Sequence, residues 1–336
     1  MVVLSLRGWH PAIARFEAMA MFPELQLERT PARRLLVGAG ESDWERTEKL
    51  SGTECVLIDG GISEWTTIDE LLSMIKVEPV QNMSVICWRH EGKLATSTKE
   101  IERRIGEMFH SKGSTINLTN PENRFGVILD ASAGLVAWGW MSGQGPGTHG
   151  WSAMNANNRP YFKPISLEPR IARAAVNIAA GTSKGVVLDP MCGTGGLLIE
   201  AALCNRSAIG IDIDPEMVNG TKQNLQWANV TAEVILGDAT NFEFPQNLSG
   251  VVIDPPYGRN SQLSESTALT TILGELVKQL KSCSLVLILP MDPGLEDLDE
   301  EIECNLEIPG FLITACLGIP VHKSLGRMMI IAKTLG

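Results

Sequence analysis

The chain has 336 residues, a formal net charge of −11, and a composition that is 44% hydrophobic and 20% charged. These values exclude a disordered chain and predict a globular protein of two or three domains. No stretch reaches the roughly 18 apolar residues of a membrane span, and the N-terminus lacks a signal-peptide core. The seven cysteines show no C-x-x-C spacing, which argues against a disulfide framework and a zinc site. We therefore expect a cytoplasmic monomer that needs neither a membrane nor a metal.

The charge is distributed unevenly along the chain. Residues 1–165 carry 17 basic and 19 acidic side chains, a net charge of −2, whereas residues 166–336 carry 11 and 20, a net charge of −9. Seven of the latter acids lie between positions 292 and 303, a run typical of a solvated loop. Because phosphate contacts need lysine and arginine, the front half is the better candidate for binding a nucleic acid.

The first 141 residues combine strand and helix patterns. A β-like run at 2–6 and a helical pattern at 13–20 predict a small ferredoxin-like subdomain over residues 1–35. A second region, residues 36–141, contains a helical pattern that starts near residue 97. Its predicted strands cover residues 55–58, 85–88 and 125–129, and an apolar segment follows at 135–141.

The helix in this region carries start and stop signals and several basic side chains. Ser97 to Glu100 forms a capping-box sequence, and Gly113 stands where a C-terminal cap is expected. A basic face on this helix suits phosphate groups, although an ordinary solvated surface explains it equally well. The candidate RNA contacts on it are Lys99, Arg103, Arg104 and Lys112.

The C-terminal half alternates strands and helices regularly. Residues 142–160 are rich in Gly, Asn and Pro and predict a linker, so the second domain is expected over residues 161–336. The alternation predicts an α/β fold with a parallel, doubly wound sheet that ends in a hairpin at 311–332. Asp214 and Pro215 are the expected N-cap and first residue of a helix. Strands are predicted at 185–188, 208–211, 232–236, 251–253 and 285–289, and helices at 168–180, 197–204, 215–228 and 272–281.

A glycine-rich segment between the first strand and the first helix of this domain predicts a cofactor site. It contains neither G-x-G-x-x-G nor a Walker lysine, which favours S-adenosyl-L-methionine over NAD, FAD or a nucleoside triphosphate. Asp189, Asp212 and Asp238 follow three successive strands, where acids meet the cofactor's amino group, its ribose hydroxyls and its adenine. The candidate cofactor residues are Asp189, Cys192, Gly193, Thr194, Gly195, Asp212, Asp238 and Ala239.

The fourth strand ends in Asp254-Pro255-Pro256-Tyr257, and two prolines in a row cannot continue a sheet. This sequence resembles the D/N-P-P-Y/F motif of methyltransferases that modify exocyclic amino groups of nucleobases. The resemblance implies that Asp254 and the Pro255 carbonyl accept the amino hydrogens and that Tyr257 stacks on the base. A simple strand-ending turn with Tyr257 packed sideways is the alternative.

Five runs along the chain together resemble the archaeal tRNA guanine-10 N2-methyltransferases, which contain a THUMP domain. The resemblance implies a THUMP-like RNA-binding domain at 36–141, a seven-stranded Rossmann-like methyltransferase domain at 161–336, and tRNA as partner. It further implies RNA contacts at Arg259, His322, Lys323 and Arg327. Met191 and Gly326 depart from the family's usual Phe and Thr. The runs are Leu4–Pro11, Arg159–Phe162, Asp189–Gly196, Asp254–Arg259 and Val321–Arg327.

Other functions remain open on the sequence alone. An rRNA guanine-N2 or an adenine-N6 methyltransferase shares the Asp-Pro-Pro-Tyr segment, and so does a protein glutamine methyltransferase without a THUMP region. A non-catalytic RNA-binding protein is the alternative from a different class. The number of methyl groups added, one or two, does not follow from these residues.

Overall fold

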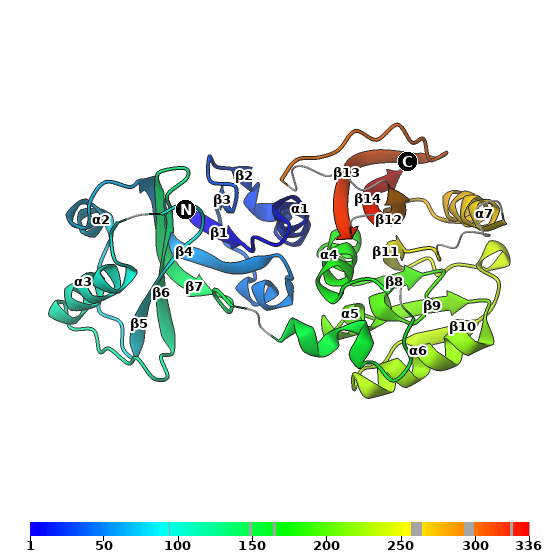
Figure 1. The fold of residues 1–336 in the computed structure, drawn as a ribbon, viewed down its shortest axis with the longest axis horizontal. Helices are drawn as coiled ribbons and strands as arrows, with labels where there is room; N and C mark the ends of the chain where they lie inside the picture. Colours follow the sequence, from blue (N-terminus) through cyan, green and yellow to red (C-terminus); the bar gives the residue numbers. More distant parts are fainter. Residues whose placement is uncertain are drawn as a thin grey trace. The chain divides into compact units, whose positions relative to one another are not determined.

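The computed structural model separates into two compact units. One consists of Met1–Pro11 and Phe22–Thr148, and the other of Ala12–Met21 and His149–Gly336 (Figure 1). Each unit is built around its own seven-stranded sheet. The structure describes residues 1–93, 95–147, 150–163, 166–256, 264–291, 299–322 and 325–335.

The sheet of the first unit has the order β2-β3-β1-β4-β7-β6-β5. Strands β5 and β6 pair in parallel and the other neighbours are antiparallel. Helices α2 (Ile68–Met74) and α3 (Thr98–Ser111) contact each other, and α3 packs on β5. The strands are β1 (Val2–Leu6), β2 (Glu28–Arg29), β3 (Leu35–Gly38), β4 (Thr53–Glu64), β5 (Met83–Arg89), β6 (Asn123–Asp130) and β7 (Leu135–Ser142).

Helix α3 presents Ile101, Ile105 and Phe109 to the core, the spacing expected of an amphipathic helix. Its end matches the prediction, because Gly113 has φ of +99° and the Ser114 N–H donates to the Phe109 carbonyl at 3.1 Å. The capping box is wrong in detail. Ser97 is the N-cap residue, but its side chain makes no capping hydrogen bond.

The expected subdomain boundary at residue 35 falls inside the first sheet. Strand β1 pairs with β3 on one side and with β4 on the other, so residues 1–35 share one sheet with the region that follows. The intervening helix α1 (Pro11–Met21) contributes Ala12–Met21 to the second unit. The assignment of residues 1–35 to a separate subdomain therefore differs from the observed architecture.

The second sheet has the order β10-β9-β8-β11-β12-β14-β13. Strands β8 to β12 pair in parallel, and β14 runs antiparallel to β12 and β13. This is the predicted α/β fold with a closing hairpin. The strands are β8 (Val186–Asp189), β9 (Ala208–Asp212), β10 (Glu233–Leu236), β11 (Leu248–Ile253), β12 (Ser284–Met291), β13 (Phe311–His322) and β14 (Leu325–Thr334), and the helices α4 (Pro169–Ala180), α5 (Gly196–Leu203), α6 (Pro215–Trp227) and α7 (Ser264–Gln279).

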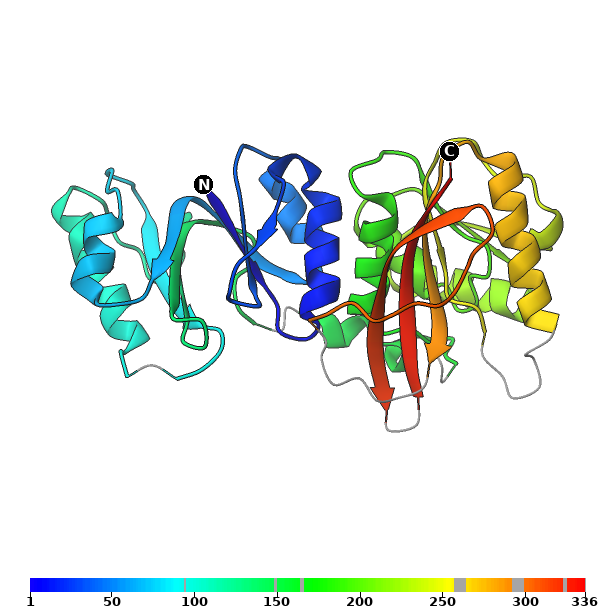
Figure 2. The ribbon, with the colours of Figure 1, turned by 90° about the horizontal axis from the view of Figure 1, so that it is seen from above.

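Helices cover both faces of this sheet (Figure 2). Successive side chains of β11 point to opposite faces of the sheet, so alternate residues contact different helices. Val251 and Ile253 join the cluster that includes Ile272 and Leu276 of α7. A Cβ on Gly250 would instead meet the carbonyl of Ala179 in α4. Within the described residues, no helix has both the length and the hydropathy needed to cross a bilayer.

Within the second unit, helix α1 is held to the other elements by polar contacts. Arg15 pairs with Asp299 at 3.0 Å, with both side chains buried. The Asn177 side chain on α4 donates to Glu17 at 2.7 Å. Buried ion pairs are costly to break, so α1 is an integral part of this unit although it lies near the N-terminus.

Candidate active site

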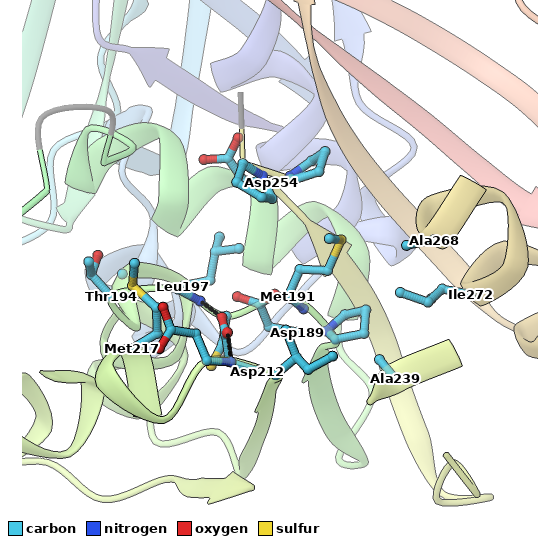
Figure 3. A pocket seen from close by; sticks show the side chains of 18 of the residues that line it. Asp189, Met191, Thr194, Leu197, Asp212, Met217, Ala239, Asp254, Ala268 and Ile272 are labelled. Carbon is cyan, nitrogen blue, oxygen red and sulfur yellow. Dashed lines mark hydrogen bonds between the residues drawn. The ribbon is translucent and has the colours of Figure 1, made fainter. Parts of the chain in front are cut away.

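A pocket of about 560 Å³ lies at the carboxyl ends of β8, β9, β10 and β11. The strand order reverses between β8 and β11, and α/β sheets bind ligands at such a switch point. Figure 3 shows Asp189, Asp212 and Asp254 around this space. These three predicted residues are therefore brought together, each from the end of a different strand.

The glycine segment forms a tight turn between β8 and α5. Gly193 and Gly195 have φ of +50° and +77°, a region that glycine adopts without penalty. A Cβ on Gly193 would meet no atom within 4 Å, so the backbone is open toward a ligand there. Thr194 also lines the pocket, as does the buried Cys192, whose thiol has a pKa raised by burial.

Asp212 ends β9 and is tied to the glycine turn. Its Oδ2 accepts the Gly193 N–H at 2.8 Å, and its Oδ1 accepts the Asp214 N–H at 2.9 Å. Figure 3 shows these two bonds as dashed lines. A carboxylate offers about four acceptor sites, so this one also has capacity for ligand hydroxyls.

Asp189 is almost completely buried at the end of β8. It accepts the Met191 N–H at 3.2 Å. Burial raises the pKa of its carboxyl well above the usual range, and the charges of Asp254 and Asp212 raise it further. Such a carboxyl is ready to receive a cationic ligand group, which would favour its ionised form.

Asp238 and Ala239 lie at the β10 end of the pocket. Asp238 caps a short 3₁₀ turn, η5 (Ala239–Asn241), and its Oδ1 accepts the Thr240 N–H at 2.9 Å. The bonds from Thr240 lower the pKa of this exposed carboxyl. Asp214 caps α6 in the same way, as predicted, by accepting the Glu216 N–H at 2.8 Å.

Arg159 lies beside Gly196, which lines the pocket, and the sequence alone indicated no role for it. Its side chain is buried, and within the described part of the chain its Nε and Nη1 have no hydrogen-bond partner. Nη1 lies 3.1 Å from the position that a Cβ on Gly196 would occupy, and Gly196 is the first residue of α5. Burial lowers the pKa of this guanidinium. A buried cation beside a helix N-terminus suits a carboxylate ligand.

Asp254 follows β11 directly and is half-buried, with Pro255 buried behind it. Its Oδ2 lies 3.4 Å from Nη1 of Arg327 on β14. The predicted role of Arg327 as an RNA contact does not fit this position, since only 3% of the residue is exposed. The predicted contacts Tyr257, Arg259 and Lys323, and the side chain of His322, lie outside the described residues.

The predicted basic face of α3 is partly neutralised. Arg103 pairs with Glu100 and Glu107 on its own helix, and Arg104 pairs with Asp69 on α2. Surface pairs of this kind contribute little to stability and exchange readily. Lys99 and Lys112 are exposed at the two ends of the helix. The role of these four side chains in RNA binding stays a prediction.

Comparison with known proteins defines the class first. Residues 156–304 match the family model described as the RMKL-like methyltransferase domain. The crystal structure of TrmN from Thermus thermophilus superposes with a TM-score of 0.50 at 17% identity, covering 99% of each chain, which shows that the fold is shared. The C-terminal unit is therefore a methyltransferase domain.

The relatives identify the family. The chain is 34% identical to the tRNA (guanine(10)-N2)-dimethyltransferase of Pyrococcus abyssi, over 71% of this chain and 70% of that protein. It is 32% identical to the enzyme of that name from Methanocaldococcus jannaschii, over 70% of this chain and 65% of that protein. The chain belongs to the tRNA (guanine(10)-N2)-dimethyltransferase family, as the resemblance in sequence implied. It is an S-adenosyl-L-methionine-dependent enzyme.

Proposed function

We propose that this protein transfers methyl groups from S-adenosyl-L-methionine to the exocyclic N2 of guanine 10 in tRNA. The observation that carries the proposal is the position of Asp254, whose carboxylate lies at the strand end beside a pocket lined by Asp189 and Asp212. The names of the archaeal relatives support guanine as the base, tRNA as the partner and two methyl groups as the final product.

The pocket residues fit the cofactor group by group. Asp212 suits the ribose hydroxyls and Ala239, with Asp238, the adenine. The open backbone at Gly193 gives the close approach that the methionine part needs. The Nε and Nη1 atoms of Arg159, which have no partner among the described residues, suit its carboxylate, and the buried Asp189 suits its ammonium. When bound, the cofactor supplies an electrophilic methyl group.

Asp254 is the group that acts on the base. The lone pair of guanine N2 is delocalised into the ring, so the amine is a poor nucleophile. A carboxylate that accepts one amino hydrogen, with the Pro255 carbonyl accepting the other, orients the nitrogen and stabilises the positive charge that develops on it. Since an aspartate of ordinary pKa is a weak base, it takes the proton late, once the nitrogen has become an ammonium.

Recognition of the base and of the RNA completes the proposal. Tyr257 stacks on guanine, a contact worth about 1–3 kcal/mol. A paired nucleotide has to be flipped out of the stem to reach the pocket. We assign binding of the tRNA body to residues 36–141 as a THUMP-like domain, with residues 161–336 as the catalytic domain. The cytoplasm is the location that this function implies.

Two tRNA transcripts that differ only at nucleotide 10 test the target. We expect labelled methyl groups to be transferred to a transcript with guanine 10 and not to one with adenine 10. Equal labelling of the two transcripts would contradict the assignment of the position. Labelling of neither, by folded protein that binds the cofactor, would contradict tRNA as the substrate.

A further inference from the structure

Arg327 reaches the predicted catalytic carboxylate from two strands away. It lies on β14, opposite Pro290 of β12, and β12 separates β14 from β11. Because adjacent strands are about 4.8 Å apart, its side chain has to cross roughly 10 Å of sheet edge to contact Asp254. The contact joins Nη1 to Oδ2 at 3.4 Å. A nearly buried guanidinium in contact with Asp254 is unsuited to bind a phosphate at the surface.

The contact between Arg327 and Asp254 lies in a pocket that contains several acidic side chains. Asp189, Asp212 and Asp254 are close enough that the charges of the last two raise the pKa of Asp189. A cation beside one of these carboxylates offsets the repulsion between their charges. Arg327 faces Asp254 with a side chain that is only 4% exposed, so the attraction is weakly screened by water.

We infer that Arg327 is a positioning residue, which fixes the plane of the Asp254 carboxylate toward the target amino group. The inference rests on the proposed function. The 3.4 Å distance is longer than the usual 2.7–2.9 Å of a charge-assisted bond. Catalytic contacts in ligand-free enzymes are commonly long and tighten when substrate binds. The guanidinium is therefore assigned to Asp254 and not to the RNA.

A double-mutant cycle separates this role from a merely structural one. Single-turnover methylation at saturating tRNA is measured for Arg327→Ala, Asp254→Ala and the double variant. In the otherwise wild-type enzyme, Arg327→Ala should lower the single-turnover rate by a factor of about 10 to 100, because a charge-assisted contact is lost. In the Asp254→Ala background it should cost less than about threefold, because the carboxylate on which it acts is gone.

Two further variants support the comparison. Arg327→Lys keeps the charge but lacks the planar fork, so it should recover part of the rate. It also remains informative if Arg327→Ala does not fold. Lys333→Ala removes an exposed charge from the same strand and should leave the rate unchanged. Affinity for S-adenosyl-L-methionine, measured by calorimetry, should stay within about threefold of the original in every folded variant.

The outcomes distinguish the inference from the function beneath it. Equal fractional losses from Arg327→Ala in both backgrounds would show that the arginine only supports the fold, and would overturn the inference. Loss of tRNA affinity with an unchanged rate at saturation would also overturn it, in favour of an RNA contact. No guanine N2 methylation by the unchanged protein would contradict the proposed function itself, and the inference with it.

Discussion

The Asp212 side chain holds the glycine turn in place and, in the proposed function, also binds the cofactor. Its carboxylate accepts one backbone N–H from the glycine turn and one from Asp214. In the proposed complex it also accepts the ribose hydroxyls. In this proposal the same side chain shapes the pocket and contacts the cofactor.

Removal of this carboxylate should weaken cofactor binding at least tenfold. Hydrogen bonds to a charged group are worth about 1.5–3 kcal/mol, which corresponds to that factor or more. Calorimetric titration of Asp212→Ala with S-adenosyl-L-methionine measures it. Glu233→Ala, at the opposite end of the neighbouring strand β10, is the matched loss of an exposed acid and should bind normally. Unchanged affinity in folded Asp212→Ala would contradict the assignment.

Asp189 should make the stability of the cofactor-free protein depend on pH. Its pKa is raised by burial in the folded state. Its contribution to stability is therefore fully present below the pKa of the unfolded chain, about 3.9, and is lost as pH rises through the higher folded pKa. Asparagine, which stays neutral, should raise the free energy of unfolding at pH 7 while weakening cofactor binding.

Urea unfolding of wild type and Asp189→Asn between pH 4 and pH 8 tests this. The stability difference should be small at pH 4 and grow with pH in favour of the variant. A difference that is constant with pH, or that favours wild type at pH 7, would contradict a buried carboxyl of raised pKa.

At the scale of elements, the contact between α4 and β11 depends on a missing side chain. A Cβ on Gly250 would lie 2.4 Å from the backbone oxygen of Ala179, and backbone cannot rotate away as a side chain can. Gly274 in α7 is the opposite case, since a Cβ there would meet nothing within 4 Å.

The two glycines should respond to alanine with opposite signs. Gly250→Ala should lower the free energy of unfolding by about 1–3 kcal/mol through overpacking. Gly274→Ala should raise it by about 0.5–1 kcal/mol, because alanine is the better helix former. Calorimetric unfolding of the two variants provides the comparison. A neutral Gly250→Ala would show that α4 is not held this closely.

The sequence predicted the regular C-terminal elements because apolar periodicity and local punctuation decide them. Strands at 186–189 and 208–212 and the capped helix at 215–227 occur close to the predicted positions. The short exposed strand β2 carries no such pattern. Strand β4 continues past Asp59 and two glycines that look like a turn. Its extent is set by pairing with β7 across a bulge.

Some residues of the candidate site could be predicted from the sequence, and others could not. Acids at strand ends are visible in sequence, because the carboxyl ends of parallel strands share one edge. The roles of Arg159 and Arg327 depend on tertiary packing instead. Arg327 meets an acid 73 positions away, which no local pattern predicts.

In the whole molecule, the two compact units do not correspond to two continuous stretches of the sequence. Ala12–Met21 belongs to the catalytic unit, so a fragment of residues 160–336 would lack a packed helix and its buried ion pair. The RNA binding that we propose for the first unit is therefore better tested by surface substitutions in the full chain. The exposed Lys99 and Lys112 are the suitable positions, because neither lies in the catalytic pocket.

Lys99→Ala with Lys112→Ala should weaken tRNA binding without affecting the cofactor. Loss of two phosphate contacts should lower the slope of log affinity against log salt by about 1.4–1.8. Gel shifts at several salt concentrations measure this, with the exposed Lys278→Ala of α7 as control. Unchanged affinity and slope would show that this face of α3 does not hold the RNA.

We propose that this pocket methylates guanine N2 in tRNA through Asp254. Mass spectrometry of nucleosides from a tRNA transcript, incubated with the protein and S-adenosyl-L-methionine, tests it most directly. We expect N2-methylguanosine followed by N2,N2-dimethylguanosine with the wild-type protein, and a loss of both with Asp254→Ala at normal cofactor affinity. Methylation of another base, or product formed by Asp254→Ala within threefold of the original rate, would contradict it.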